Sequence, residues 1–208
     1  MIKAILFDMD GVLIDARSWH YDALNLALSH FGYKISLESH LLTFDGLPTK
    51  NKLEILSDTI NLPEGLHDII SSLKQKYTIQ ISHQKCKPNF NHLFALSRLS
   101  KQYKLAVCSN SIKNTIDTLM NLSGLNQYLD FILSNEDVEK SKPSPDIYLK
   151  AFDKLDLAPK ECLILEDNPN GIKAAIDSGA YCLKIGEPND VTLKLIQSKI
   201  KDIENKEG

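Results

Sequence analysis

Two carboxylates, Asp8 and Asp10, stand at the end of a short apolar run close to the N-terminus. Alternate side chains of an extended strand point the same way, so both carboxylates can approach one centre if the strand direction continues past Asp8. Gly11 then allows a backbone turn that residues with a Cβ resist. Two carboxylates so placed suit Mg²⁺ binding, nucleophilic attack and proton transfer. The alternative is an acidic junction between a strand and a loop.

Three more polar clusters occur later in the chain. Ser109 and Asn110 lie where a strand runs into a helix start, a place suited to phosphate oxygens, although a serine there could simply cap the helix. Lys142 precedes another helix start and could neutralise phosphoryl charge or be an ordinary surface lysine. Glu166 and Asp167 end an apolar run, where paired acids need a cation unless they form a solvent-facing turn.

The elements that must position these clusters alternate between strands and helices, which predicts an α/β fold with a parallel sheet and helices on its faces. Apolar runs predict strands at residues 3–8, 104–108, 131–134, 162–166 and 181–185. Helical spacing predicts helices at 90–102, 111–122, 145–156 and 169–178, the second of them capped by Ser111. The carboxyl ends of parallel strands form the ligand-binding edge, so Asp8, the Asp10 carbonyl, Glu166 and Asp167 could converge on one Mg²⁺.

Residues 16–85 interrupt this alternation with helical patterns alone. Apolar residues recur at helical spacing in three stretches, the second of which follows a turn at Gly46 with Thr49 as its expected N-cap. A run of helices inserted after the first strand predicts a separate helical domain over 16–85. Residues 1–15 and 86–208 would then form a Rossmann-like core of three α/β/α layers.

The composition of the 208 residues is that of an ordinary globular chain, with 43% hydrophobic and 25% charged residues. The formal charge is −3 and no long run of one sign is present, so nothing points to a nucleic-acid partner. No apolar stretch approaches the length needed to cross a bilayer, and the N-terminus lacks the layout of a secretory signal. We therefore expect a cytoplasmic protein without a nucleic-acid or membrane partner, and a monomer by default.

The four cysteines form no C-x-x-C pair. Three of them lie in or beside apolar runs, which predicts small buried hydrophobic residues rather than ligands or nucleophiles. The fourth, Cys86, is near His83 and His92 in the sequence, and a zinc site there is an alternative. The spacing matches no standard zinc finger, which disfavours that alternative.

Together and in this order, the polar clusters resemble the four motifs of the haloacid dehalogenase superfamily. The matching segments are Asp8–Gly11, Ser109–Asn110, Lys142–Pro143 and Glu166–Asp167. The resemblance extends over most of the chain and looks strongest to the branch that holds β-phosphoglucomutase and phosphoglycolate-type phosphatases. That branch carries a helical cap between its first and second motifs, which agrees with the helical domain expected over residues 16–85.

The resemblance implies a role for each matching residue. Asp8 would attack phosphorus and form an aspartyl-phosphate, and Asp10 would protonate the leaving oxygen and then take a proton from water. Ser109 and the Asn110 amide would hold phosphoryl oxygens, and Lys142 would offset charge on the phosphoryl group and the nucleophile. The Mg²⁺ ligands would be Asp8, Asp10, Glu166 and Asp167. Asp10 also favours phosphoryl transfer over dehalogenation, since a departing halide needs no proton.

Substrate choice would depend on the helical cap. There the resemblance implies contacts from His20, Gly46, Thr49 and Lys50. His20 could alternatively be an ordinary helical histidine. Mutases of this branch carry a basic residue before the glycine and an arginine after it, to hold a second phosphate, but here Asp45 and Thr49 stand in those places. Lys50 and Lys52 could supply the missing charge.

The function expected from the sequence is a Mg²⁺-dependent phosphatase that hydrolyses a small phosphorylated metabolite through an aspartyl-phosphate. A sugar-phosphate mutase of the β-phosphoglucomutase type is the alternative, and its product would be an isomer instead of inorganic phosphate. A non-catalytic binding protein on the same scaffold is disfavoured, because all four motifs keep their reactive residue types.

Overall fold

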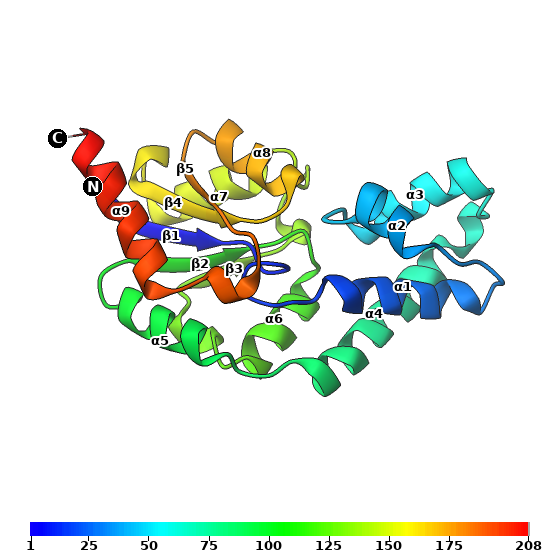
Figure 1. Cartoon of the computed structure of the whole chain (residues 1–208). Helices are drawn as coiled ribbons and strands as arrows, with labels where there is room; N and C mark the ends of the chain where they lie inside the picture. Colours follow the sequence, from blue (N-terminus) through cyan, green and yellow to red (C-terminus); the bar gives the residue numbers. More distant parts are fainter. Residues whose placement is uncertain (208) are drawn as a thin grey trace. The chain divides into compact units, whose positions relative to one another are not determined.

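Five strands form one parallel sheet within residues 1–207, which the computed structural model describes (Figure 1). In their order across the sheet, the strands are β3 (Phe131–Leu133), β2 (Lys104–Cys108), β1 (Ala4–Phe7), β4 (Cys162–Glu166) and β5 (Tyr181–Lys184). Every neighbouring pair is parallel. The predicted α/β class is therefore confirmed, and each strand lies within one residue of its predicted bounds.

Helices cover both faces of the sheet and make the outer layers of the core (Figure 1). α7 (Asp146–Leu155) and α8 (Pro169–Asp177) lie on one face, where they share a hydrophobic cluster with side chains of β1, β2 and β4. α5 (Phe90–Leu99) and α6 (Lys113–Leu122) lie on the other face, and α9 (Leu193–Glu207) contacts α5. Short 3₁₀ turns join these elements at Asn126–Tyr128, Asn135–Asp137, Pro159–Glu161 and Pro188–Asp190. Because both faces are covered, β1 and β4 are buried throughout and read as continuous apolar runs.

The register of β1 brings the ends of three strands to the same edge of the sheet. Phe7 pairs with Val107 of β2 on one side and with Leu165 of β4 on the other. The Asp8 N–H also donates to the Leu165 carbonyl (N···O 3.0 Å), which continues the pairing past the end of β1. Residues that follow these strands therefore leave the sheet side by side.

Residues 16–86 form a compact helical unit, distinct from the core unit made of residues 1–15 and 87–208. Its elements are α1 (Arg17–Ser29), α2 (Leu37–Ser39), the π-helix η1 (His40–Phe44), α3 (Thr49–Ile60), the 3₁₀ turn η2 (Glu64–Leu66) and α4 (His67–Lys85). α1 packs against α4, and residues of α1, α3 and α4 form a hydrophobic cluster of their own. The Asn25 side chain binds both the N–H and the carbonyl of Ile35 (2.9 and 3.1 Å), which fastens the segment after α1. That this unit acts as a cap stays a prediction.

Two helix starts differ from those expected. Thr49 is the first residue of α3, and Pro48 precedes it as the N-cap without a side-chain hydrogen bond. α6 begins at Lys113, and Ser111 instead donates its hydroxyl to the Asp10 carboxylate (Oγ···Oδ2 2.9 Å). Both N-cap predictions are wrong. A carboxylate is a stronger partner for the serine than a helix end, and proline already restricts the backbone that enters α3.

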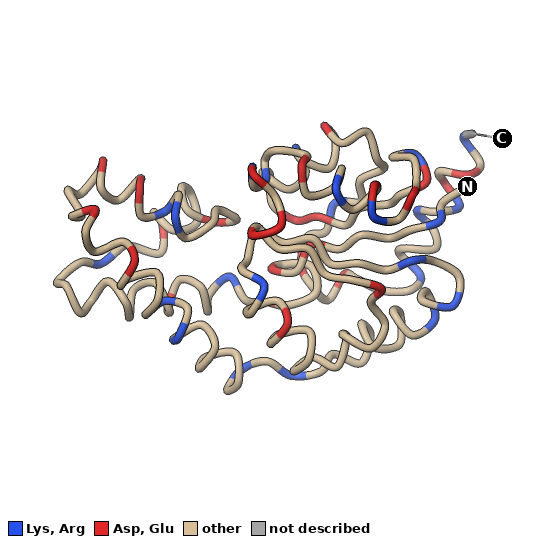
Figure 2. Tube along the Cα trace, turned by 180° about the vertical axis from the view of Figure 1, so that it is seen from behind, with Lys and Arg blue, Asp and Glu red and all other residues tan. Residues whose placement is uncertain are grey.

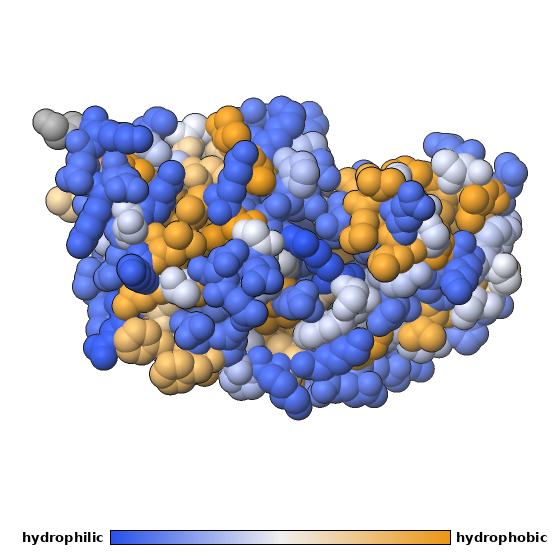
Figure 3. Space-filling model, in the orientation of Figure 1, coloured by the Kyte–Doolittle hydropathy of each residue, from blue (hydrophilic) through white to orange (hydrophobic). Residues whose placement is uncertain are grey.

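No helix within residues 1–207 combines the length and the apolar composition needed to cross a bilayer. Basic and acidic residues are interspersed along both units (Figure 2). On the face that Figure 3 shows, apolar side chains gather in patches on both units, with hydrophilic side chains around them. Since charges of both signs are spread over the surface, the buried polar side chains are a better guide to function than the surface charges.

Candidate active site

A tight turn after β1 carries Asp8 and Asp10. The Met9 carbonyl accepts the Ile14 N–H (2.9 Å), and the Gly11 N–H donates to the Ile14 carbonyl (2.8 Å). Gly11 has a φ of 89°, in the left-handed region that glycine adopts without steric penalty, and the predicted turn is confirmed. The turn leaves Asp8 buried and Asp10 half-buried.

Lys142 lies at the centre of the site. Its Nζ donates to Asp8 Oδ1, to Glu166 Oε1 and to the Cys108 carbonyl, each at 2.7 Å. An ammonium group has three protons, so two carboxylates and one backbone oxygen use its whole donor capacity. Burial by itself would lower the pKa of Lys142, but the charges of Asp8 and Glu166 outweigh this and raise it above its usual value. Lys142 is therefore a buried charged group and not a surface lysine.

Three carboxylates converge beside this lysine. Oxygen atoms of Asp8, Glu166 and Asp167 lie within 4.8 Å of one another. Burial raises the pKa of the Asp8 carboxyl well above its ordinary value; Lys142 opposes the rise, and Glu166, Asp167 and Asp10 add to it. Glu166 Oε2 is buried without a hydrogen-bond partner in the described part of the chain. Hard oxygen donors with an excess of negative charge are what Mg²⁺ prefers, so the residues present fit this ion.

Asp10 lies outside that group of three, and its expected part in metal binding, through the backbone carbonyl, stays a prediction. Its carboxylate accepts the Ser111 hydroxyl, while the Ser109 hydroxyl accepts the Ser111 N–H (3.1 Å). Ser109 is itself buried, with 1% of its surface exposed. Ser111 thereby joins the turn after β1 to the end of β2, a role that a local capping argument did not foresee.

The Asn110 side chain fixes the backbone of Lys142. Its Oδ1 accepts the Lys142 N–H (3.0 Å), and its Nδ2 donates to the Lys142 carbonyl (3.1 Å). The peptide bond that follows, between Lys142 and Pro143, is cis. The side chain of Asn110 is therefore a positioning group, and the expected phosphoryl contact remains a prediction for its backbone amide.

Tyr148 and Gly171 belong to the site although neither was expected there. The buried Tyr148 hydroxyl donates to Glu166 Oε1, and the Lys142 ammonium lies 5.0 Å from the centre of its ring. Burial, with the charge of Glu166, raises the pKa of Tyr148, so the hydroxyl remains a donor. A Cβ at Gly171 would come within 2.1 Å of the Glu166 carboxyl atoms. In the sequence, Tyr148 reads as part of an apolar helix face and Gly171 as an ordinary helical glycine.

The four residues expected to contact substrate from the helical unit differ in burial. His20 of α1 is buried, and its Nδ1 lies 3.3 Å from Lys74 Nζ. Gly46 is exposed and has a φ of 71°. Thr49 is half-buried at the start of α3, and Lys50 is exposed on the same helix. Their contacts with substrate stay predictions.

Cys108 contributes its backbone carbonyl to the site, as an acceptor for Lys142, and no chemistry is assigned to the cysteine thiols. Burial raises the pKa of Cys108 and of Cys162 to about 12, as expected for inert packing groups. Cys182 is only half-buried, and burial raises its pKa to about 11. Within residues 1–207, the carboxylates around Asp8 are the one group of three metal-ligating side chains, so the zinc alternative at Cys86 gains no support.

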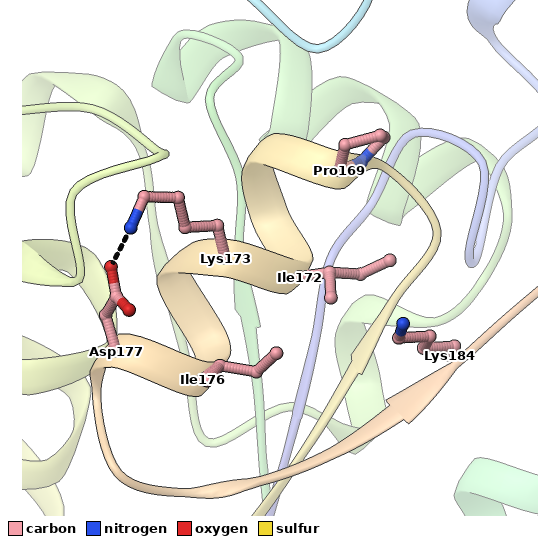
Figure 4. Close-up of a pocket in the computed structure, with 6 residues that line it drawn as sticks. All are labelled: Pro169, Ile172, Lys173, Ile176, Asp177 and Lys184. Atoms are coloured by element: carbon pink, nitrogen blue, oxygen red, sulfur yellow. Dashed lines mark hydrogen bonds and ion pairs between the residues drawn. The ribbon is translucent and has the colours of Figure 1, made fainter.

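A hollow of about 350 Å³ lies along α8 and β5 of the core unit (Figure 4). It is lined by Pro169, Ile172, Lys173, Ile176, Asp177 and Lys184. Lys173 and Asp177, four positions apart on α8, form an ion pair along one side of the helix (2.6 Å). None of the residues in the acidic cluster lines this hollow, which is therefore separate from the candidate active site.

Gly171→Ala should disturb the site although alanine is the better helix former. In an open helix the change would stabilise by about 0.5–1 kcal/mol. Here the new methyl group overlaps the Glu166 carboxyl, and we expect the free energy of unfolding to fall by about 1–3 kcal/mol in urea titrations. Gly65→Ala is the control, because no atom lies within 4 Å of the added methyl group. Equal effects of the two substitutions would contradict the packing argument.

Tyr148→Phe removes one hydroxyl and keeps the ring. We expect Mg²⁺ affinity, measured by calorimetry without substrate, to weaken about tenfold, because Glu166 loses a hydrogen bond that holds its carboxylate in place. Tyr128→Phe, a half-buried tyrosine outside the site, is the matched control. Unchanged affinity in Tyr148→Phe would show that Lys142 alone is enough to orient Glu166.

Known proteins resemble this chain in sequence. Residues 5–185 match the sequence pattern of the haloacid dehalogenase-like hydrolases. A phosphorylated carbohydrates phosphatase from Thermotoga maritima is 25% identical over 179 residues, which make up 86% of this chain and 82% of that protein. The pyrophosphatase PpaX of Bacillus mycoides is 26% identical over 198 residues, or 88% of this chain and 83% of that protein.

The fold is shared with solved structures as well. β-Phosphoglucomutase from Clostridium difficile has a TM-score of 0.84 to this chain at 23% identity, covering 97% of this chain and 98% of its own. The span that matches the family pattern includes all four motifs, from Asp8 to Asp167. The chain therefore belongs to the haloacid dehalogenase-like hydrolase family.

Proposed function

We propose that the protein is a Mg²⁺-dependent phosphatase that hydrolyses a small phosphorylated metabolite through an aspartyl-phosphate on Asp8. The observation that carries the proposal is the setting of Asp8, a buried carboxylate held by Lys142 and close to two further acids. Membership of the hydrolase family and similarity to a protein named as a phosphatase support the same reaction.

In the first half of the reaction, a carboxylate oxygen of Asp8 attacks phosphorus. The bond between phosphorus and the ester oxygen breaks, and that oxygen leaves with a proton from Asp10. The Ser111 hydroxyl, which donates to Asp10 Oδ2, holds the Asp10 carboxyl in place for this transfer. Lys142 offsets negative charge on Asp8 as the phosphoryl group arrives.

In the second half, Asp10 takes a proton from a water molecule whose oxygen attacks the phosphoryl group. The bond between phosphorus and Asp8 breaks, inorganic phosphate leaves, and Asp8 is again a free carboxylate. One water is consumed for each ester. Asp8, Glu166 and Asp167 would hold Mg²⁺, which when bound supplies positive charge against the repulsion between the nucleophile and the phosphoryl group.

Two other reactions use the same phosphoryl-transfer chemistry. A mutase would return the phosphoryl group to another hydroxyl of its substrate, and a pyrophosphatase would cleave a phosphoanhydride. The chain shares its fold with β-phosphoglucomutase and is similar in sequence to PpaX, so the experiment must distinguish hydrolysis of an ester from both of these reactions. The helical unit, which we propose as a cap, would favour hydrolysis if it admits water to the aspartyl-phosphate.

Hydrolysis of p-nitrophenyl phosphate tests the proposal. We expect turnover with Mg²⁺, loss of turnover with a chelator, and recovery when Mg²⁺ is returned. Asp8→Asn, which keeps the side-chain volume but removes the nucleophile, should lower kcat by about four orders of magnitude. Asp153→Asn, an exposed position on α7, is the control and should keep full activity.

The products separate the three reactions. Inorganic phosphate released from a panel of sugar phosphates, without an isomer, supports the phosphatase. An isomer in place of phosphate would establish the mutase, and a marked preference for inorganic pyrophosphate would establish the pyrophosphatase. Near-normal activity of Asp8→Asn would contradict the proposed nucleophile in all three.

A further inference from the structure

The hollow along α8 and β5 is a concave surface of the core unit, separate from the acidic cluster (Figure 4). Its volume of about 350 Å³ lies at the lower end of the range in which proteins bind small molecules. Every residue that lines it belongs to the core unit, so the hollow is complete within that unit. The side chains around it therefore define the chemistry of a compact ligand.

Apolar side chains of α8 make one wall of the hollow. Pro169, Ile172 and Ile176 recur at intervals of three and four residues, so they share one face of the helix. Ile176 is 58% exposed, and covering its side chain would be favourable. A single exposed isoleucine is common, but three apolar residues around one hollow form a surface that an apolar ligand group can cover.

The charged side chains around the hollow leave one positive charge in excess. Lys173 forms its ion pair with Asp177 (2.6 Å), so the ammonium group of Lys184 is the charge that remains. Figure 4 shows Lys184 extending from β5 toward Ile172, whereas the ion pair lies on the other side of α8. A cation beside an apolar wall suits a ligand that combines one anionic group with an apolar body.

Both walls of the hollow continue into the residues that hold Glu166. On one side, α8 begins at Pro169, and a Cβ at Gly171 of the same helix would overlap the Glu166 carboxyl. On the other side, Lys184 is paired with Glu166 in the register of β5 and β4, and the Ile185 N–H donates to the Glu166 carbonyl (2.7 Å). A ligand between α8 and β5 therefore contacts neighbours of Glu166 on two sides.

We propose that this hollow is a regulatory site for a compact organic acid, a molecule with one carboxylate and an apolar body, whose binding strengthens Mg²⁺ binding at the acidic cluster. The apolar body covers Ile172 and Ile176, and the carboxylate meets the Lys184 ammonium group. By holding α8 against β5, the ligand favours the packing of Gly171 on Glu166, and a carboxylate fixed in place binds a metal ion more tightly. The inference rests on the proposed function in one respect, which is that the acidic cluster binds Mg²⁺.

Binding in the hollow is tested by NMR on the full chain with isotope-labelled isoleucine methyl groups. The two signals of interest are assigned from Ile172→Val and Ile176→Val. Phenylacetate is the probe; 2-phenylethanol lacks its charge, and acetate lacks its apolar body. We expect saturable shifts of both signals with phenylacetate, an affinity about fivefold lower for 2-phenylethanol, and an affinity at least about tenfold lower for acetate.

Lys184→Gln removes the charge and keeps an exposed polar side chain. The phenylacetate affinity should fall about fivefold, the size expected for one exposed ion pair, while the 2-phenylethanol affinity stays unchanged. Lys184→Arg should keep the phenylacetate affinity, and Lys194→Gln, an exposed position on α9, should not change it. Shifts that do not saturate, or equal phenylacetate affinities in Lys184→Gln and in the unmodified protein, would overturn the site.

The link to the acidic cluster is tested by calorimetry of Mg²⁺ binding without substrate. Saturating phenylacetate should raise the Mg²⁺ affinity about fivefold, and Mg²⁺ should raise the phenylacetate affinity by the same factor, because coupling between two sites is reciprocal. Acetate at the same concentration is the control for binding of Mg²⁺ by a free carboxylate.

The outcomes separate the site, its regulatory role and the proposed function. Mg²⁺ binding that phenylacetate leaves unchanged would overturn the regulatory role alone. If the protein binds no Mg²⁺, the proposed Mg²⁺-dependent reaction and the regulatory role are both wrong. In each case the isoleucine signals alone decide whether the hollow binds an organic acid.

Discussion

The hydrogen bonds of the Lys142 ammonium group are the interaction on which the rest of the active site depends. They join the ends of β1, β2 and β4 through Asp8, the Cys108 carbonyl and Glu166. Two carboxylates held close together inside a protein repel each other, and the positive charge of the lysine offsets part of that repulsion. A buried ion pair contributes little net stability once desolvation is counted. Its use here is to fix the positions of the groups that would carry out phosphoryl transfer.

The residues around Lys142 act by holding it or its partners. Asn110 fixes its backbone, Tyr148 shares Glu166 with it, and Gly171 leaves space for the Glu166 carboxylate. These contacts come from the loop after β2 and from helices α7 and α8, so both the sheet and one of its outer layers support the site. Supporting shells of this kind keep charged side chains in place without contacting the ligand.

The strands, and the grouping of Asp8, Lys142 and the Glu166–Asp167 pair at the ends of the strands, could be predicted because the sequence signals for them are local and strong. Strands buried on both faces give continuous apolar runs, and the four motifs combine reactive residue types in a fixed order. Tyr148 could not be found this way, since a tyrosine on an amphipathic helix reads as a packing residue until its partner, 18 positions away, is known. Ser111 was misread for a similar reason, because its acceptor Asp10 is 101 positions distant and outweighs a local helix end. Lys52 is buried, which likewise depends on how the helices of its own unit pack.

The claim at the centre of this interpretation is that Asp8 receives the phosphoryl group beside Lys142 while a divalent ion lies among the neighbouring acids. A crystal structure with Mg²⁺ and beryllium trifluoride, which mimics a phosphoryl group on a carboxylate, tests it most directly. We expect beryllium bonded to Asp8, Lys142 within hydrogen-bond distance of Asp8, and Mg²⁺ held by the cluster of Asp8, Glu166 and Asp167. Beryllium on another side chain, or Mg²⁺ bound outside the acidic cluster, would contradict it.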